Sequence, residues 1–565
     1  MNRADRRRRK AQQAKAGRPS DTLAVRTLLD EGKAHHQAGR LSEAEQAYRL
    51  ALELTPQHPE AFHLLGLLLY RLGRFDEAIT FITNAIDQQS SNPLYWFNLG
   101  VVTQKASRRE EAIRAYRQAI TLNPQYLDAF INLGNVLKDH GSTTEAKEVY
   151  RQALALNPSH ADTHNNLGVT LKEEGRLEEA IDSYRRALHL KPMHLEALNN
   201  LGIALMERGT LREAISSFEQ ALTIMPEYLK ALYNLGVARS WAGDDPMAVA
   251  CLQKAADLKH NHGRPVTETA VYRSRIAHDC EQIQYLLDRA ILGEEHRPYL
   301  HELQRLRAEL SRHPASSNRV TIPPETLAPV APSFNRLLYR APAERISHGA
   351  LNPALDVAAI ESGYLARQPE VTFIDDLLTQ EALNTLRRFC WESTIWRLDY
   401  ENGYIGAFLG DGFATPLLFQ IAEELRLKFP RIFKQHRLTQ SWAFKYDSTR
   451  RGLNIHADAA AVNVNFWITP DKANLNPDTG GLVVYDKEAP RTWNFRDYNN
   501  DRNKPKIFEW LKEVNAQAVK IAYRANRAVV FNSDLFHETD EVSFENDYLS
   551  RRINITLLYG YRHQG

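Results

Sequence analysis

Small and bulky residues alternate along the N-terminal half of the chain with a period of 34. Glycine stands at every 34th position from Gly32 to Gly236, and alanine keeps the same period at two phases that begin at Ala44 and Ala51. Bulky side chains fill the intervals and prolines close the units: Tyr48, Tyr116, Tyr150, Tyr184 and Phe218, and Pro56, Pro124, Pro158, Pro192 and Pro226. Because small residues let helices approach closely and proline ends a helix, each unit predicts a pair of antiparallel helices.

This pattern resembles the tetratricopeptide repeat, in seven copies over residues 25–262. A repeat of this kind buries its apolar face only against its neighbours. The resemblance therefore implies an all-α superhelix with a long concave groove. We expect a partner protein or a polypeptide substrate to bind in that groove.

Asparagine stands two residues before the repeat glycine in five repeats: Asn98, Asn132, Asn166, Asn200 and Asn234. Helix propensity does not explain five copies, because asparagine is a poor helix former. Two explanations stay open. The amides either bond neighbouring helices across the stack, or they line the groove and hold the backbone of an extended peptide. The second arrangement resembles the repeat domain of protein O-GlcNAc transferase, and that likeness is confined to the repeats.

After the repeats the pattern changes from helical to extended. Residues 263–312 have apolar spacings of three and four, which predict helices that cap the last repeat. Prolines then cluster over residues 313–334, which indicates a linker. From residue 335 to residue 565, short runs of β-branched and aromatic residues predict strands with a few helices.

Three potential metal ligands accompany these predicted strands. His456-Ala-Asp458 precedes a strand-like run, and His537 follows another. In an extended chain His456 and Asp458 would share one face. Two imidazoles and one carboxylate on one face of a metal ion are the ligand set of many ferrous oxygenases. The tripeptide His160-Ala-Asp162 is a second copy of this motif, but it falls at a helix-pair turn without a further ligand.

The order of these residues resembles the 2-oxoglutarate/Fe(II)-dependent dioxygenases, in particular the prolyl-hydroxylase-like enzymes. The resemblance implies a mainly-β double-stranded β-helix, or jelly roll, with flanking helices over residues 335–565. It implies Fe(II) on His456, Asp458 and His537 as the catalytic centre. It also implies 2-oxoglutarate and O2 as co-substrates and allows ascorbate as a further cofactor. In the family, oxygen splits 2-oxoglutarate to succinate and carbon dioxide while the substrate is hydroxylated.

The resemblance also implies an arginine beyond the second histidine that binds the far carboxylate of 2-oxoglutarate. On a strand, Arg552 shares one face with Asn554 and Thr556, whereas Arg551 shares the opposite, apolar face. A buried polar pocket favours Arg552. Arg551 stays an alternative, because the interval from His537 is longer than the family usually shows.

The same resemblance implies roles for two further residues. Asn554 stands at the serine position of the family's Arg-x-Ser element, and Tyr446 takes the place of a tyrosine that contacts the co-substrate. Residues 488–518 form an insertion that we interpret as a lid or substrate wall, although its aromatic residues could equally pack on the linker. These aromatics are Trp493, Phe495, Tyr498 and Trp510.

Composition limits the remaining function classes. The 565 residues exceed what one core usually holds, and the net charge of +2 gives no overall bias toward nucleic acid or membrane. Cys251, Cys280 and Cys390 stand far apart, which indicates free thiols in a reducing compartment. Without an apolar run that could span a bilayer or direct secretion, we expect a cytoplasmic protein. Residues 1–24 hold a basic block, which predicts a disordered tail and the one segment suited to nucleic acid.

Together these features predict a hydroxylase whose protein or peptide substrate is recruited by the repeat groove. Two alternatives stay open. One is a non-catalytic scaffold, in which the repeats assemble partners and the barrel is degenerate. The other is a small-molecule hydroxylase that uses the repeats for docking. The oxidised residue and the oligomeric state are left open by the sequence.

Overall fold

The computed structural model describes residues 19–261, 270–313, 317–366, 369–446, 455–490, 493 and 503–560. The chain forms two compact units, Met1–Thr210 and Leu211–Gly565. The described part contains no helix that is long and apolar enough to cross a membrane. Most of the predicted basic tail lies outside the described residues. The three cysteines are buried and unpaired, as predicted.

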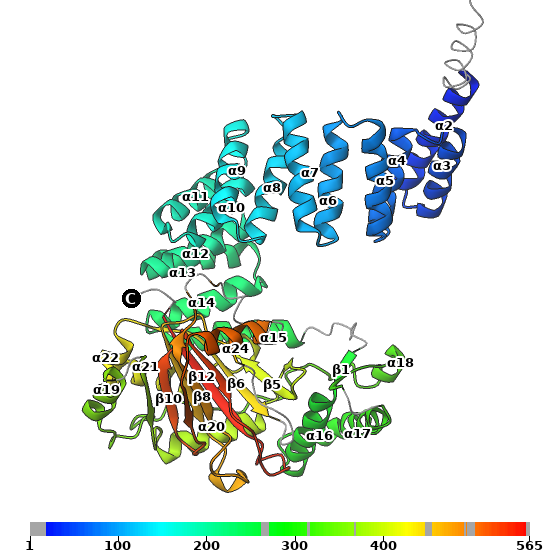
Figure 1. The fold of residues 1–565 in the computed structure, drawn as a ribbon. Helices are drawn as coiled ribbons and strands as arrows, with labels where there is room; N and C mark the ends of the chain where they lie inside the picture. Colours follow the sequence, from blue (N-terminus) through cyan, green and yellow to red (C-terminus); the bar gives the residue numbers. More distant parts are fainter. Residues whose placement is uncertain are drawn as a thin grey trace, which may run out of the picture. The chain divides into compact units, whose positions relative to one another are not determined.

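The first unit consists of helices that follow one another in antiparallel pairs (Figure 1). They are α2 (Pro19–Gln37), α3 (Leu41–Leu54), α4 (Pro59–Arg71), α5 (Phe75–Gln88), α6 (Pro93–Lys105), α7 (Arg109–Leu122), α8 (Leu127–Asp139), α9 (Thr143–Leu156), α10 (Ala161–Glu173), α11 (Leu177–Leu190) and α12 (Leu195–Arg208). The predicted helix pairs are confirmed.

The repeat glycine lies where the two helices of a pair are closest. A Cβ atom added at Gly134 would lie 2.5 Å from Cε1 of Tyr150, and one added at Gly168 would lie 2.6 Å from Cε1 of Tyr184. Real Cβ atoms do not approach so closely, so only glycine leaves room for the fully buried aromatic ring of the second helix. The periodic glycine and the periodic aromatic residue are therefore two halves of one packing contact.

The second unit begins with three further helices of the repeat pattern, α13 (Leu211–Ile224), α14 (Leu229–Trp241) and α15 (Asp245–Asn261). Ala248 and Leu252 of α15 belong to the same apolar core as Phe413 and Leu417. Lys259 Nζ and His260 Nε2 of α15 also lie 2.7 and 2.8 Å from Oδ1 of the buried Asp411. The last repeat is thus covered by the C-terminal domain itself.

The segment after the repeats differs from the prediction. Helices α16 (Arg273–Asp288) and α17 (Arg297–Ser311) do form, but α16 packs on α20 (Gln380–Glu392) and β5 (Tyr404–Phe408) rather than capping α15. The predicted linker is also structured. In it, β2 (Arg319–Thr321) pairs with β1 (Ala270–Tyr272), and α18 (Pro324–Leu327) follows. Buried apolar residues hold this region together around its own core, including Ile283, Leu303, Val320, Leu327 and Phe334.

The rest of the second unit is rich in β-strands with flanking helices, as predicted. Its elements are α19 (Val357–Leu365), β3 (Val371–Ile374), β4 (Leu398–Asp399), α21 (Pro416–Lys428), α22 (Pro430–Phe433), β6 (Leu438–Tyr446), β7 (Val462–Trp467), β8 (Leu482–Glu488), α24 (Lys504–Glu513), β9 (Ala518–Ile521), β10 (Ala528–Asn532), β11 (Leu535–Thr539) and β12 (Ile553–Tyr559), with α20 and β5 as given above. Short 3-10 turns at Glu294–His296, Leu409–Asp411 and Asp471–Ala473 complete the described elements.

These strands form two antiparallel sheets. The larger sheet has seven strands in the order β3-β10-β7-β12-β6-β5-β4, and the smaller has three in the order β11-β8-β9. A bridge between His456 and His537 adds residue 456 to the edge of the smaller sheet. From β6 to β12 the chain passes repeatedly from one sheet to the other.

Side chains alternate strictly between the two faces of the larger sheet. On β7, Val464 and Phe466 pack against the helices α20 and α21, while Asn463 and Asn465 point to the opposite face. On β6 it is Trp442, Phe444 and Tyr446 that join the core shared with the smaller sheet. Polar residues therefore stand on the inner face of this sheet, between the two sheets, where the candidate ligands also lie.

Candidate metal centre

His456 and His537 are direct neighbours on adjacent extended segments. The backbone N–H of His456 donates to the carbonyl of His537 (3.0 Å), and the N–H of His537 donates to the carbonyl of His456 (2.8 Å). In such an antiparallel pair both side chains point to the same face. The two imidazole rings accordingly lie 4.3 Å apart, centroid to centroid.

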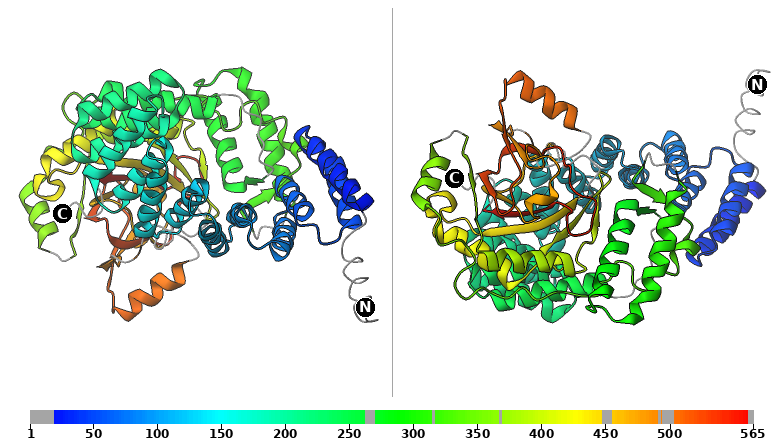
Figure 2. Two further views of the ribbon diagram at one scale, coloured as in Figure 1. Left: turned by 90° about the horizontal axis from the view of Figure 1, so that it is seen from above. Right: turned by 90° about the horizontal axis from the view of Figure 1, so that it is seen from below.

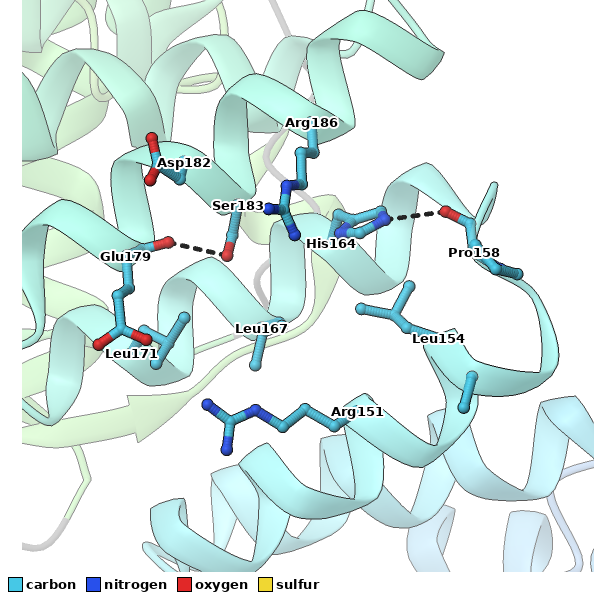
Figure 3. A pocket seen from close by; sticks show the side chains of 11 residues that line it. Arg151, Leu154, Pro158, His164, Leu167, Leu171, Glu179, Asp182, Ser183 and Arg186 are labelled. Carbon is cyan, nitrogen blue, oxygen red and sulfur yellow. Dashed lines mark hydrogen bonds between the residues drawn. The ribbon is translucent and has the colours of Figure 1, made fainter.

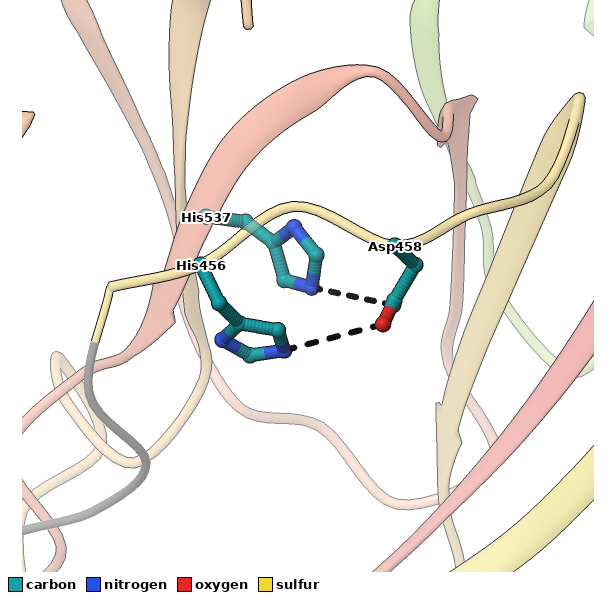
Figure 4. Close-up of side chains that lie close together, drawn as sticks. All are labelled: His456, Asp458 and His537. Carbon is teal, nitrogen blue, oxygen red and sulfur yellow. Dashed lines mark ion pairs between the residues drawn. The ribbon is translucent and has the colours of Figure 1, made fainter. Parts of the chain in front are cut away.

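Asp458 completes the group two residues after His456 (Figure 4). Its Oδ1 lies 4.0 Å from Nε2 of His456, and its Oδ2 lies 3.5 Å from Nε2 of His537. One ligand atom from each of the three residues lies within 4.8 Å of the other two, and this is the metal-ligand group found in the described chain. The structure thus brings together the three residues that the sequence singled out.

The electrostatics of the group suit a cation. Burial by itself would raise the pKa of the Asp458 carboxyl, but the hydrogen bond to His537 and the nearby His456 hold that pKa below its usual range. Nδ1 of His537 lies 3.1 Å from the carbonyl oxygen of Leu535, and Nε2 is directed at Asp458. A proton held on Nδ1 by that carbonyl would leave the Nε2 lone pair to a metal ion. An ionised carboxylate and imidazole lone pairs are what a divalent transition metal requires.

An apolar cluster supports the ligand strands from behind. Ile455 and Ala457 flank His456, and Phe536 precedes His537, so all three point away from the site. They pack with Ile507 and Leu511 of α24, which lies on the outside of the strands (Figure 2). The described part of the insertion is therefore not a lid over the site. Trp493 and Trp510 join this cluster, whereas Phe495 and Tyr498 lie outside the described residues.

Arg552 lies buried on the inner face of the larger sheet, with 1% of its surface exposed. Its Nε donates to the carbonyl of Gly480 (2.6 Å) and its Nη2 to that of Gly481 (3.3 Å), while Nη1 is buried without a hydrogen-bond partner. The guanidinium carbon stands 4.7 Å from the ring centre of Tyr446. Burial lowers the pKa of this guanidinium, and nearby Tyr446, Tyr523 and Asp540 only partly offset that effect. It is a cation with an unused donor.

Arg551 has a different environment. Its Nε and Nη2 form a two-pronged ion pair with the carboxylate of Glu281 on α16, each at 2.9 Å. This pair lies on the opposite face from Arg552, as the strand parity predicted. Arg551 is therefore committed to a structural contact, and Arg552 is the arginine on the side of the histidines.

The cavity between the sheets is lined by the three ligand residues and by side chains of β6, β7, β8, β11 and β12: Trp442, Phe444, Asn465, Leu482, Thr539, Asn554 and Thr556. Its volume of about 20 Å³ suffices for about one water molecule. Tyr446 reaches it indirectly, since its hydroxyl lies 3.2 Å from Oγ1 of Thr539.

Asn554 lines the cavity, but its hydrogen bonds differ from those expected of a residue at the family's serine position. Its Nδ2 donates to Asn465 Oδ1 (2.9 Å) and to Thr556 Oγ1 (3.1 Å), so the donors of this side chain are already used. What remains is an acceptor, Oδ1. Asn463 and Asn465 also belong to this polar layer, and the sequence analysis missed them. The alternation Val-Asn-Val-Asn at residues 462–465 was the available signal.

Family models for the tetratricopeptide repeat match residues 131–194, 166–228 and 59–92, and a TPR repeat model matches residues 32–73 and 108–141. The N-terminal part of the chain is an array of tetratricopeptide repeats. The search of curated proteins gave no match.

Similar solved structures include pilF from Pseudomonas aeruginosa, with 22% identity over 38% of this chain and 96% of that chain and a TM-score of 0.34. YrrB, described as a TPR protein with an unusual peptide-binding site, has 26% identity over 32% of this chain and 93% of that chain, with a TM-score of 0.28. MamA from Desulfovibrio magneticus has 18% identity over 30% of this chain and 96% of that chain, with a TM-score of 0.29.

Asn98, Asn166 and Asn200 bond across the stack, which was the first of the two explanations. Nδ2 of Asn200 donates to Oδ1 of Asn165 (3.0 Å), and Nδ2 of Asn166 donates to Oδ1 of Asn135 (3.0 Å). Asn98 similarly lies 2.7 Å from Nε2 of His63. All five asparagines that stand two residues before a repeat glycine are only half-buried. A contact of these side chains with a peptide therefore stays a prediction.

A pocket of about 450 Å³ lies on α9, α10 and α11 of the tetratricopeptide array, and none of the five asparagines lines it. Figure 3 shows Arg151 and Arg186 on opposite sides of it, with His164 directed at the carbonyl of Pro158 (2.9 Å). The nearby second copy of the motif has only a structural role. His160 accepts from the N–H of Thr163 as a helix cap (3.2 Å), and Asp162 lies 2.9 Å from His194.

Proposed function

We propose that residues 335–565 form a 2-oxoglutarate- and Fe(II)-dependent oxygenase of jelly-roll architecture. The observation that carries this proposal is the convergence of His456, Asp458 and His537 from separate segments onto one point. The strand order supports the architecture. Strands β6, β7, β10 and β12 belong to one sheet and β8, β9 and β11 to the other, which is how a double-stranded β-helix is wound.

The donor set fits ferrous iron. Nε2 of the two histidines and a carboxylate oxygen of Asp458 would occupy one face of the ion and leave the cavity side open for other ligands. Bound there, ferrous iron would supply the activation of O2 for hydroxylation. The protein's part is to hold the three ligands on rigid strands and to exclude water, which the apolar cluster behind them favours.

The buried arginine fits the far carboxylate of 2-oxoglutarate. Nη1 of Arg552 is an orphaned donor, and a carboxylate accepts well from a guanidinium fork. Tyr446 packs against the same guanidinium and holds its plane. Because the cavity is narrow, a five-carbon acid would have to displace side chains around Thr539 and Leu482. We expect Arg552 to exchange its bond to the Gly480 carbonyl for one to the acid.

We further propose that the substrate is a protein or peptide recruited by the tetratricopeptide repeats. Such repeats typically bind peptide or protein partners, and a tethered partner reaches a high local concentration at the catalytic domain. The repeats favour the protein substrate over a small molecule that uses them only for docking. They are equally the basis of the alternative, a scaffold without catalysis, which the complete ligand set disfavours.

The test is succinate production from 2-oxoglutarate by the purified full chain with Fe(II), ascorbate and O2. We expect His456→Ala, His537→Ala and Arg552→Ala each to abolish turnover. His160→Ala is the matched control, because it alters the same tripeptide motif away from the site and should keep full turnover. Turnover of the unmodified protein no faster than that of the three variants would exclude the enzyme and favour the scaffold.

A further inference from the structure

Four polar side chains between the sheets form a continuous hydrogen-bonded chain that ends at Asp458. Asn463 Nδ2 donates to Asp458 Oδ2 (2.6 Å), and Asn465 Nδ2 donates to Asn463 Oδ1 (2.6 Å). Asn465 Oδ1 accepts from Asn554 Nδ2 (2.9 Å) and from Thr556 Oγ1 (2.8 Å). None of the four is more than 4% exposed. Burying polar side chains is costly unless each finds a hydrogen-bond partner, so this network is held in one defined arrangement.

The carboxylate fixes the direction of every amide in this chain. An ionised carboxylate only accepts hydrogen bonds, so Asn463 must turn its nitrogen to Asp458 and its oxygen to Asn465. The same constraint then passes to Asn465 and on to Asn554. Asn554 spends its amide protons on Asn465 and Thr556, and its Oδ1 is left buried without a hydrogen-bond partner. Since Asn554 lines the cavity, that oxygen is an acceptor awaiting a donor.

We infer that Asn463 and Asn465 are positioning residues for the Asp458 carboxylate, and that Asn554 Oδ1 accepts a hydrogen bond from an N–H or O–H group of the molecule bound in the cavity. This inference rests on the proposed metal site. Asn463 occupies Oδ2 and thereby fixes the plane of the carboxylate relative to the two imidazoles. A bound group that offers only oxygen acceptors, as 2-oxoglutarate does, would leave that amide oxygen unsatisfied, so the donor belongs to a second group in the cavity, a water molecule or the substrate.

The positioning role is tested with Co(II), which gives both an affinity by calorimetry and a visible absorption spectrum. Asn463→Leu and Asn463→Ala remove the donor to Asp458, and we expect them to weaken Co(II) binding about 10- to 100-fold and to alter the spectrum. Thr556→Val removes the far end of the chain and should have a smaller effect of the same kind. Thr469→Val is the matched control, because its buried hydroxyl also makes two hydrogen bonds, but only to the backbone near Arg551 and Ile553.

Thermal unfolding of the metal-free variants separates a loss of fold from a loss of positioning, and Thr556→Val carries the test if both Asn463 variants fail to fold. Co(II) affinity and spectrum unchanged in correctly folded variants would overturn the inference and leave the proposed function intact. No Co(II) binding by the unmodified protein would overturn both.

The acceptor role is tested with two small probes added to the Co(II) protein. Glycolate offers an O–H donor beside its carboxylate, whereas acetate offers acceptors only. We expect the preference for glycolate over acetate to fall in Asn554→Leu relative to the unmodified protein. An unchanged preference ratio would show that Asn554 Oδ1 accepts nothing from the bound group.

Discussion

The tetratricopeptide repeats and the β-sheet domain use contacts of opposite kinds. In the repeats, Gly134 and Tyr150 come from consecutive helices, and the same glycine–tyrosine contact recurs at Gly32, Gly100 and Gly168. In the sheet domain, Asp458 and His537 come from segments far apart in sequence and meet once. A repeated local contact builds a regular helical array, whereas a single distant convergence brings three potential metal ligands to one point.

Charge is also distributed differently in the two regions. The repeats carry ion pairs with exposed side chains, such as Arg74 with Glu77. The second unit buries charge, and Arg275 lies fully buried against Asp279 at 2.9 Å. Exposed pairs contribute little to stability, while removing one partner of a buried pair leaves a desolvated charge. The second unit should therefore be the more sensitive of the two to pH and to polar substitutions.

Among the substitutions that test this contrast, the largest effect is expected at the pair of neighbouring arginines. Arg552→Met should weaken 2-oxoglutarate binding about 10- to 100-fold, because it removes a charge-assisted pair from a dry site. Arg551→Met should leave that affinity unchanged and instead lower stability, because Glu281 loses its partner. Isothermal titration with 2-oxoglutarate in the presence of Mn(II) measures the first effect and thermal unfolding the second. If Arg551→Met were the variant that lost affinity, the assignment of the two arginines would be reversed.

A glycine substitution tests the repeated contact in the repeats. Gly134→Ala places a methyl group 2.5 Å from the Tyr150 ring, so we expect a loss of about 1–3 kcal/mol from overpacking. Glycine to alanine inside a helix otherwise stabilises by about 1 kcal/mol, so the sign of the change is itself diagnostic. Urea unfolding of the full chain provides the measurement. A stabilised variant would mean that the aromatic ring is free to move aside.

The sequence predicted more of the structure of the repeats than of the second unit. The period defined by Gly32, Ala44 and Tyr48 located the helix pairs, because each repeat meets the same neighbours. Strand parity correctly separated Arg552 from Arg551, since a sheet buried on both sides still alternates its faces. The cap expected from residues 263–312 was wrong, because apolar spacing shows that a helix is amphipathic but not which surface covers it. The bond from Asn463 to Asp458 was missed for a similar reason: the alternation at residues 462–465 places the asparagines on one face of a strand but does not show which side chain lies beside them.

The buried charges predict a pH effect that is larger in the second unit than in the first. Burial would raise the pKa of Asp279, but Arg275 outweighs it and holds that pKa at about 2. Because the folded pKa lies below the unfolded value of about 3.9, the stabilisation is present above pH 4 and is lost as the pH falls toward 2. The stabilisation amounts to about 2–3 kcal/mol. Hydrogen exchange at pH 5 and pH 3 should show the second unit loosening first, and Asp279→Asn should flatten this dependence. Equal loosening of the repeats would contradict the contrast between the two regions.

The smallest effect is expected at the asparagines between repeats. Asn200→Ala removes the bond to Asn165 and should cost about 1 kcal/mol of stability. If the Asn200 side chain also contacts a bound peptide, Asn200→Ala should weaken peptide binding by more than the loss of stability explains. Asn165→Ala is the matched control, because it breaks the same bond from the other side without removing the Asn200 amide. Equal binding by both variants would restrict these residues to a structural role.

The most direct measurement is an anaerobic titration of the full chain with Fe(II), which tests whether the three converging side chains hold one metal ion. The account predicts one Fe(II) ion per chain. His537→Ala and Asp458→Ala should each weaken Fe(II) binding by more than about 100-fold, because loss of a metal ligand costs more affinity than loss of a residue that only bonds to a ligand. His160→Ala should leave Fe(II) binding unchanged. Fe(II) binding that survives removal of His537 and Asp458, or no binding by the unmodified chain, would contradict it.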